Sequence, residues 1–93
     1  MTRDEFIQAA IERGWILENE HKLTRGTDGL IALGFNWAMR KGEGDDDVAI
    51  CWQVDFRQSE YYSNAALVGA TVLLTSTGEN KPLTPAMLDE LLK

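Results

Sequence analysis

The densest group of chemically active side chains lies in the stretch KGEGDDDVAICWQVDF, residues 41–56. Four carboxylates occur there within five positions: Glu43, Asp45, Asp46 and Asp47. Such a cluster can bind a metal ion, contact a basic partner or form a solvated turn. A calcium loop that starts at Glu43 would need glycine at its sixth position and glutamate at its twelfth. Those positions hold Val48 and Val54, so we expect no metal site.

The ordinary interpretation of this charge run is a solvated loop. Gly42 and Gly44 supply backbone freedom, and aspartate tolerates turn conformations. The alternative is a recognition surface, because clustered carboxylates accelerate association with a cationic partner. We therefore keep the four carboxylates as candidate binding residues.

The chain has one cysteine, Cys51, and one histidine, His21. A nucleophilic cysteine needs a nearby base or positive charge to lower its pKa, and no spacing connects His21 to Cys51. Glycine-rich nucleotide-binding motifs are also missing from the sequence. We therefore expect no catalytic residue, no cofactor and no enzymatic activity. A small enzyme that uses Cys51, His21 or Asp55 is the least favoured alternative.

The charge balance limits the classes of partner. Fifteen acidic residues against nine basic ones give a net charge of −6. Nucleic-acid binding depends on clustered lysine and arginine, and only Arg40 and Lys41 are adjacent. We expect binding neither to nucleic acid nor to a membrane. No secretion signal or membrane-spanning run is recognisable, which favours a cytoplasmic protein.

Two strands are expected to position the acidic cluster. Large apolar residues occupy alternate positions over residues 30–40 and again over residues 48–57, as in strands with one buried face. Pairing Trp37 with Trp52 places both apolar sets on one face of a hairpin, and a slip of one residue would expose one set. The sequence therefore predicts a hairpin whose tip is residues 42–47.

The other face of this predicted hairpin carries small side chains, which would let a partner approach closely. In this register Asn36 lies opposite Gln53, and Ala38 and Cys51 share the face. A partly exposed sheet face is the ordinary interpretation, and an interface is the alternative. The adjacent tyrosines Tyr61 and Tyr62 are added as candidate contact residues, because exposed tyrosine is common at interfaces.

The remaining elements follow from local signals. Thr2 and Glu5 have the spacing of a capping box, followed by an apolar helical stripe that ends near Gly14. Residues 15–25 are expected to form either a strand or a loop. Residues 65–77 are expected to form a strand, with a helix as the alternative. The stretch TGENKP predicts a turn. Thr84 followed by proline predicts a C-terminal helix.

These elements predict an α+β fold: an antiparallel sheet of three to four strands with N- and C-terminal helices packed on one face, in the order α-(β)-β-β-β-α. Residues 1–93 are expected to form one domain. The leading functional hypothesis is a small acidic, non-enzymatic protein-binding domain. It would act as an inhibitor or immunity-type factor, encoded by a phage or mobile element, that blocks a basic surface. The alternative is a homo-oligomeric assembly subunit.

Overall fold

The computed structural model describes residues 1–27, 29–40, 52–57, 60–61, 66–67, 69–74 and 77–93. The chain begins with helix α1 (Arg3–Glu12), and the predicted capping box is confirmed. The Thr2 hydroxyl accepts a hydrogen bond from the Glu5 backbone N–H, and the Glu5 carboxylate accepts one from the Thr2 N–H. Gly14 ends the helical region with a φ of 94°, a conformation that glycine adopts without strain.

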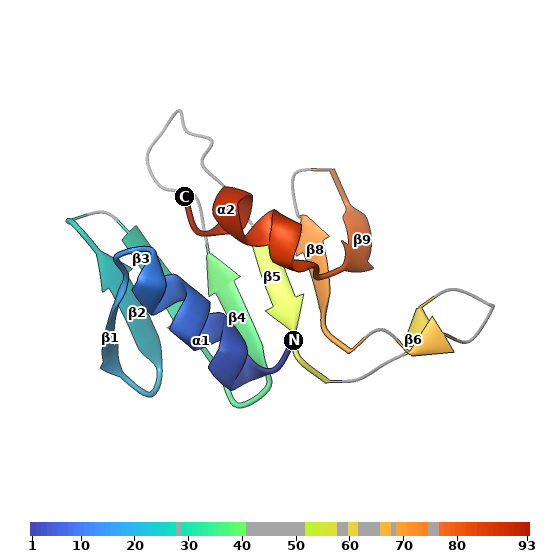
Figure 1. Ribbon diagram of the computed structural model, residues 1–93, viewed down its shortest axis with the longest axis horizontal. Coiled ribbons are helices and arrows are strands. Elements are labelled where there is room, and N and C mark those ends of the chain that lie inside the picture. The colour runs from blue at the N-terminus through green and yellow to red at the C-terminus, as the bar shows by residue number, and fades with distance from the viewer. Residues whose placement is uncertain (28, 41–51, 58–59, 62–65, 68, 75–76) are drawn as a thin grey trace.

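Seven strands follow in one antiparallel sheet, in the order β1-β2-β3-β4-β5-β8-β9. Their bounds are β1 (Ile16–Asn19), β2 (Lys22–Arg25), β3 (Gly29–Leu33), β4 (Trp37–Arg40), β5 (Trp52–Asp55), β8 (Thr71–Leu74) and β9 (Glu79–Pro82). Between β5 and β8 the chain forms a separate two-stranded ribbon of β6 (Glu60–Tyr61) and β7 (Ala66–Leu67), away from the main sheet (Figure 1). The chain ends in a 3₁₀ turn, η1 (Pro85–Met87), and the short helix α2 (Leu88–Leu91).

Both α-helices lie on the same face of the sheet (Figure 1). We call this the covered face, and the opposite one the helix-free face. The Phe6 ring of α1 packs edge-on against Trp52 of β5, with 5.8 Å between ring centroids. The core on the covered face includes Phe6, Trp15, Leu23, Ile31, Trp52, Val54, Val72 and Leu92, each at most 2% exposed. Burial of these large side chains is the main favourable term that holds helices and sheet together.

The end of α2 is fixed by donors from strands and from the segment after α1. The indole Nε1 of Trp15 donates to the Leu92 carbonyl at 2.9 Å, and that of Trp52 donates to the Leu91 carbonyl at 3.2 Å. The guanidinium group of Arg40 donates to the carbonyls of Leu91 and Lys93. These bonds satisfy carbonyl groups that a helix leaves without intrahelical partners.

The predicted sheet of three to four strands is wrong, because the sheet has seven. Two strands, β1 and β2, form from residues 15–25, and part of the predicted turn TGENKP is strand β9. Residues 30–40 form two strands rather than one. The chain reverses over residues 34–36, where the Gly34 N–H donates to the Trp37 carbonyl at 2.8 Å.

The predicted hairpin register is also wrong. In the β4–β5 pair, Trp37 lies opposite Asp55 and Arg40 lies opposite Trp52. This differs by three residues from the predicted pairing of Trp37 with Trp52, and an odd shift moves a set of side chains to the other face. As a result, Trp52 is buried on the covered face and Trp37 lies on the helix-free face. The connecting residues 41–51 lie outside the described residues.

Candidate functional site

The pairing register defines the rows of side chains on the helix-free face. One row crosses the sheet through Met39, Gln53, Leu73 and Asn80, and the next through Trp37, Asp55 and Thr71. Directly paired residues of antiparallel strands point to the same side, so the members of each row are neighbours on one surface.

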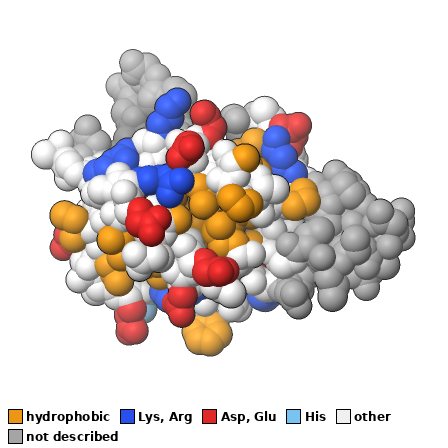
Figure 2. Space-filling model, viewed as in Figure 1, with side chains coloured by type: hydrophobic (Ala, Val, Ile, Leu, Met, Phe, Trp, Pro, Cys, Tyr) orange, Lys and Arg blue, Asp and Glu red, His pale blue; other side chains and the backbone are white. Residues whose placement is uncertain are grey.

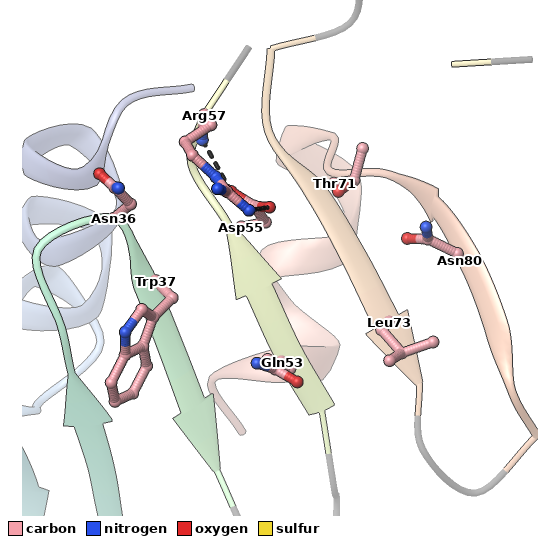
Figure 3. A pocket seen from close by; sticks show the side chains of 8 residues that line it. All are labelled: Asn36, Trp37, Gln53, Asp55, Arg57, Thr71, Leu73 and Asn80. Carbon is pink, nitrogen blue, oxygen red and sulfur yellow. Dashed lines mark hydrogen bonds and ion pairs between the residues drawn. The ribbon is translucent and has the colours of Figure 1, made fainter. Parts of the chain in front are cut away.

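Residues of these two rows form most of the lining of a shallow, open pocket of about 350 Å³. It is lined by Asn36, Trp37, Gln53, Asp55, Arg57, Thr71, Leu73 and Asn80 (Figure 3). Figure 3 shows these side chains on the side of the sheet away from the helices, with β4, β5, β8 and β9 as the floor. We refer to this feature as the Trp37 pocket.

An ion pair forms one wall of the Trp37 pocket. Arg57 donates from Nε to Asp55 Oδ1 at 3.0 Å and from Nη2 to Oδ2 at 2.7 Å. The Arg57 backbone N–H adds a bond to Oδ1 at 2.9 Å. These side-chain hydrogen bonds from Arg57 hold the pKa of the Asp55 carboxyl below its usual value, because they stabilise the ionised form. The same contact raises the pKa of Arg57, and the pair adds no net charge to the pocket.

The other polar groups of the pocket include three side-chain amides, those of Asn36, Gln53 and Asn80. Within the described part of the chain, the side chains of Asn36 and Gln53 make no hydrogen bond, whereas the Asn36 main-chain carbonyl accepts one from the Phe56 N–H at 2.8 Å. A side-chain amide offers two N–H donors and a carbonyl acceptor. The amide groups of Asn36 and Gln53 are therefore available to a ligand.

The Trp37 ring is the large apolar surface of the pocket, and its side chain is 38% exposed. The ring packs over Gly34, where a Cβ atom would lie 2.1 Å from Cε2 and Nε1 of the indole. Glycine at this position therefore lets the ring lie close to the turn before β4. Trp15 and Trp52, by contrast, are 2% and 0% exposed.

The helix-free face is different at its β1–β3 end. Ile16 pairs with Thr24, which pairs with Leu30, so the three residues form one row. Ile16 is 59% exposed and Leu30 is 50% exposed. Lys22 and Ala32 lie in the neighbouring row, next to Met39. We call the surface of Ile16, Thr24, Leu30, Ala32 and Met39 the apolar half of this face.

The charges of the apolar half balance. Two charged residues border the apolar half. The base is Lys22, which pairs with Ala32. The acid is Glu18, whose carboxylate accepts a hydrogen bond from the Thr24 hydroxyl at 2.9 Å. Hydrophobic side chains are also visible on the covered side near α1 and α2 (Figure 2), where several carboxylates lie among them. Because one acid and one base border it, the apolar half is nearly neutral, although the net charge of the chain is −6.

The predicted binding residues do not form one surface. Asn36 and Gln53 both line the Trp37 pocket, although Gln53 pairs with Met39 and is not opposite Asn36. The expectation that Ala38 lies on an accessible face is wrong, because it points into the covered core and is 0% exposed. Its partner Val54 is likewise 0% exposed.

The other predicted binding residues are placed only in part. Glu43, Asp45, Asp46, Asp47, Cys51 and Tyr62 lie outside the described residues. Tyr61 belongs to β6, where it pairs with Ala66 in the separate ribbon. Asp55 lines the Trp37 pocket, whereas His21 lines a different pocket. The fold therefore does not bring these two alternative catalytic residues into one pocket.

Most residues of the Trp37 pocket are not predicted as binding residues by the sequence. Trp37 was assigned to the core because its position continues the alternation of Ile31 and Leu33, and Asp55 was considered only as a remote catalytic candidate. One local signal was available: Asp55 and Arg57 are two residues apart, so both can project from the same side of one strand and form an ion pair.

Among the described residues, no three His, Cys, Asp or Glu side chains lie close enough together to hold a metal ion. None of the described helices is long and apolar enough to cross a membrane. Comparison of the chain with protein-family models, curated proteins and solved structures gives no match.

Proposed function

We propose that this protein is a non-enzymatic protein-binding domain whose partner is a second copy of itself. The apolar half of the helix-free face carries the proposal. Ile16 and Leu30 expose more than a third of their side chains within one row. Contiguous apolar patches of this kind on soluble proteins are commonly interaction sites.

The charge of the apolar half favours a second copy over a basic partner. A basic surface would meet a single carboxylate here, that of Glu18, with Lys22 on the same half of the face. A two-fold symmetric interface brings a patch against its own copy, so it needs a surface that is complementary to itself. One acid, one base and a row of aliphatic side chains meet that requirement, because Lys22 can approach Glu18 of the partner subunit.

The sheet, with helices on one face only, resembles one half of a β-sandwich. Two antiparallel sheets can pack face to face at about 10 Å, with side chains of both inner faces interleaved. Packing two copies on their apolar halves would bury Ile16 and Leu30 and leave both helices on the outside. The hypothesis of an inhibitor or immunity-type factor that binds a basic surface through the acidic loop stays a prediction, since that loop lies outside the described residues.

The test is the mass of the protein in solution, measured by light scattering during size-exclusion chromatography over a range of protein concentrations. The monomer mass is 10.4 kDa, and we expect twice that value at high concentration. The variants Ile16→Arg and Leu30→Arg should each shift the equilibrium to monomer, because an arginine in the interface would be desolvated without a partner.

Leu17→Arg is the matched control. Leu17 is adjacent to Ile16 in the same strand and 42% exposed, but its row continues through Leu23 and Ile31 on the covered face. This variant should keep the wild-type mass. A wild-type protein that stays monomeric at every concentration, or a control that dissociates as fully as Leu30→Arg, would contradict the proposed interface.

A further inference from the structure

The Trp37 pocket lies outside the apolar half and carries an inference that does not depend on self-association. Its volume of about 350 Å³ lies at the lower end of the range for small-molecule sites, which is about 300–1,000 Å³. The pocket is open on the helix-free face, so a ligand would be held against a surface and not enclosed. Its lining combines one aromatic ring, amides, a hydroxyl and an ion pair.

The charge of the lining restricts the class of ligand. Asp55 and Arg57 are the charged side chains of the lining, and they are bonded to each other through both carboxylate oxygens. A phosphate or carboxylate ligand would have to compete with Asp55 for Arg57. A cationic ligand would have to compete with Arg57 for Asp55. A neutral polar ligand avoids both costs.

The hydrogen-bonding groups restrict the ligand further. The side-chain amides of Asn36 and Gln53 each offer donors and an acceptor, and the Thr71 hydroxyl can do both. Arg57 donates from Nε and Nη2 to Asp55. Its Nη1 group makes no hydrogen bond with the described residues and can donate to a ligand. A ligand that fits these groups must present several hydroxyl-type groups that both donate and accept.

The Trp37 ring requires an apolar face on the same ligand. An exposed indole is a flat hydrophobic surface that gains from contact with C–H groups or another ring. A pyranose sugar has this combination, because its ring hydrogens form an apolar face and its hydroxyl groups surround the rim. We propose that the Trp37 pocket binds a neutral saccharide, with the sugar ring stacked on Trp37 and its hydroxyls bonded to Asn36 and Gln53.

The experiment is a titration of the isotopically labelled protein with neutral disaccharides of glucose, galactose, mannose and N-acetylglucosamine, followed by the indole N–H signals in NMR spectra. The indoles of Trp15 and Trp52 are hydrogen-bonded to main-chain carbonyls inside the protein. They therefore serve as internal references for the fold. We expect a saturable shift of the Trp37 signal with at least one disaccharide and little change of the other two.

Three variants separate stacking from hydrogen bonding, with binding of the Trp37→Ala and Trp37→Phe proteins followed by backbone amide signals of β5. Trp37→Ala should weaken binding about tenfold or more, as expected for loss of an aromatic contact and its buried area. Trp37→Phe should retain most of the affinity, and Gln53→Leu should weaken binding while it preserves the shape of the pocket. Leu17→Ser, which lies outside both the pocket and the apolar half, is the control and should bind like the wild type.

Two results would overturn the inference. One is the absence of a saturable shift with every disaccharide in the panel. The other is equal affinity of the wild type and Trp37→Ala, which would place any sugar contact elsewhere. The saccharide inference survives a monomeric mass in solution, and the proposed dimer survives failure of the sugar titration, so the two failures are distinguishable.

Discussion

Trp37 and Trp52 are in neighbouring strands of one sheet, and their surroundings differ completely. Trp52 lies on the covered face, is 0% exposed, contacts Phe6 and donates to the Leu91 carbonyl. Trp37 lies on the helix-free face, is 38% exposed and borders a pocket lined by polar side chains. One residue type therefore supports the core on one face of the sheet and forms a candidate site on the opposite face.

Substitution of the two tryptophans should separate these roles most widely. Trp52→Ala should lower the free energy of unfolding by about 3–5 kcal/mol, the usual cost of truncating a fully buried aromatic side chain. Trp37→Ala should lower it by less, about 1–2 kcal/mol, because more than a third of this residue is already exposed. Urea denaturation followed by circular dichroism measures both values. Equal losses for the two variants would contradict the assignment of the faces.

Gly34→Ala tests the contact that positions Trp37 in its pocket. The new Cβ atom would overlap the indole ring, and overpacking of this kind costs about 1–3 kcal/mol. We expect a loss near the lower limit, because the half-exposed ring can rotate away towards solvent. The fluorescence emission of Trp37 should shift to longer wavelength. An unchanged emission spectrum together with unchanged stability would show that the ring does not pack on this turn.

The pH dependence of the Asp55–Arg57 pair should give the smallest effect. The folded-state pKa of Asp55 is lowered from its usual value of 3.8 by the Arg57 hydrogen bonds. The ionised carboxyl therefore stabilises the fold above the unfolded-state pKa, and this contribution is lost as the pH falls through the lower folded-state pKa. Exposed ion pairs contribute little, so we expect a small difference in stability between wild type and Asp55→Asn at neutral pH.

That difference should shrink in acid, and denaturation curves of both proteins from neutral pH down to about pH 2 would measure it. The variant Asp89→Asn is the reference for loss of an aspartate–arginine ion pair elsewhere, because Asp89 pairs with Arg13 on the covered side. A difference between wild type and Asp55→Asn that grows in acid would contradict the lowered pKa.

Several elements were predictable because their signals are local. The capping box of α1 depends on two residues three positions apart, and it is confirmed. The prediction of one strand over residues 65–77 is confirmed only in part, because the chain there forms β7 and β8 in different sheets, with Gly69 at a φ of 73° between them. Within the second part, the burial of Ala70 and Val72 follows the predicted alternation. Strands β1, β2 and β9 were harder to predict, because their polar sequences show little alternation and become strands by pairing with neighbours.

The candidate site was less predictable than the elements that carry it. The sequence predicts Asn36 and Gln53 as a facing pair. Both line the Trp37 pocket, but Gln53 pairs with Met39, and Asn36 lies just before β4. Ala38 was selected on the same register and is buried. The predicted register is wrong because residues 30–40 form two strands, with a reversal at residues 34–36 that a continuous strand does not have.

The sequence by itself determined where α1 begins, that alternating segments such as residues 52–55 and 71–74 are strands, and the acidic balance of the chain. The tertiary structure alone decided which face each side chain occupies. Alternation relates two residues to one face only while the strand is continuous, and the reversal at residues 34–36 starts a new phase for β4. The length of that turn therefore placed Trp37 on the helix-free face and Ala38 in the core.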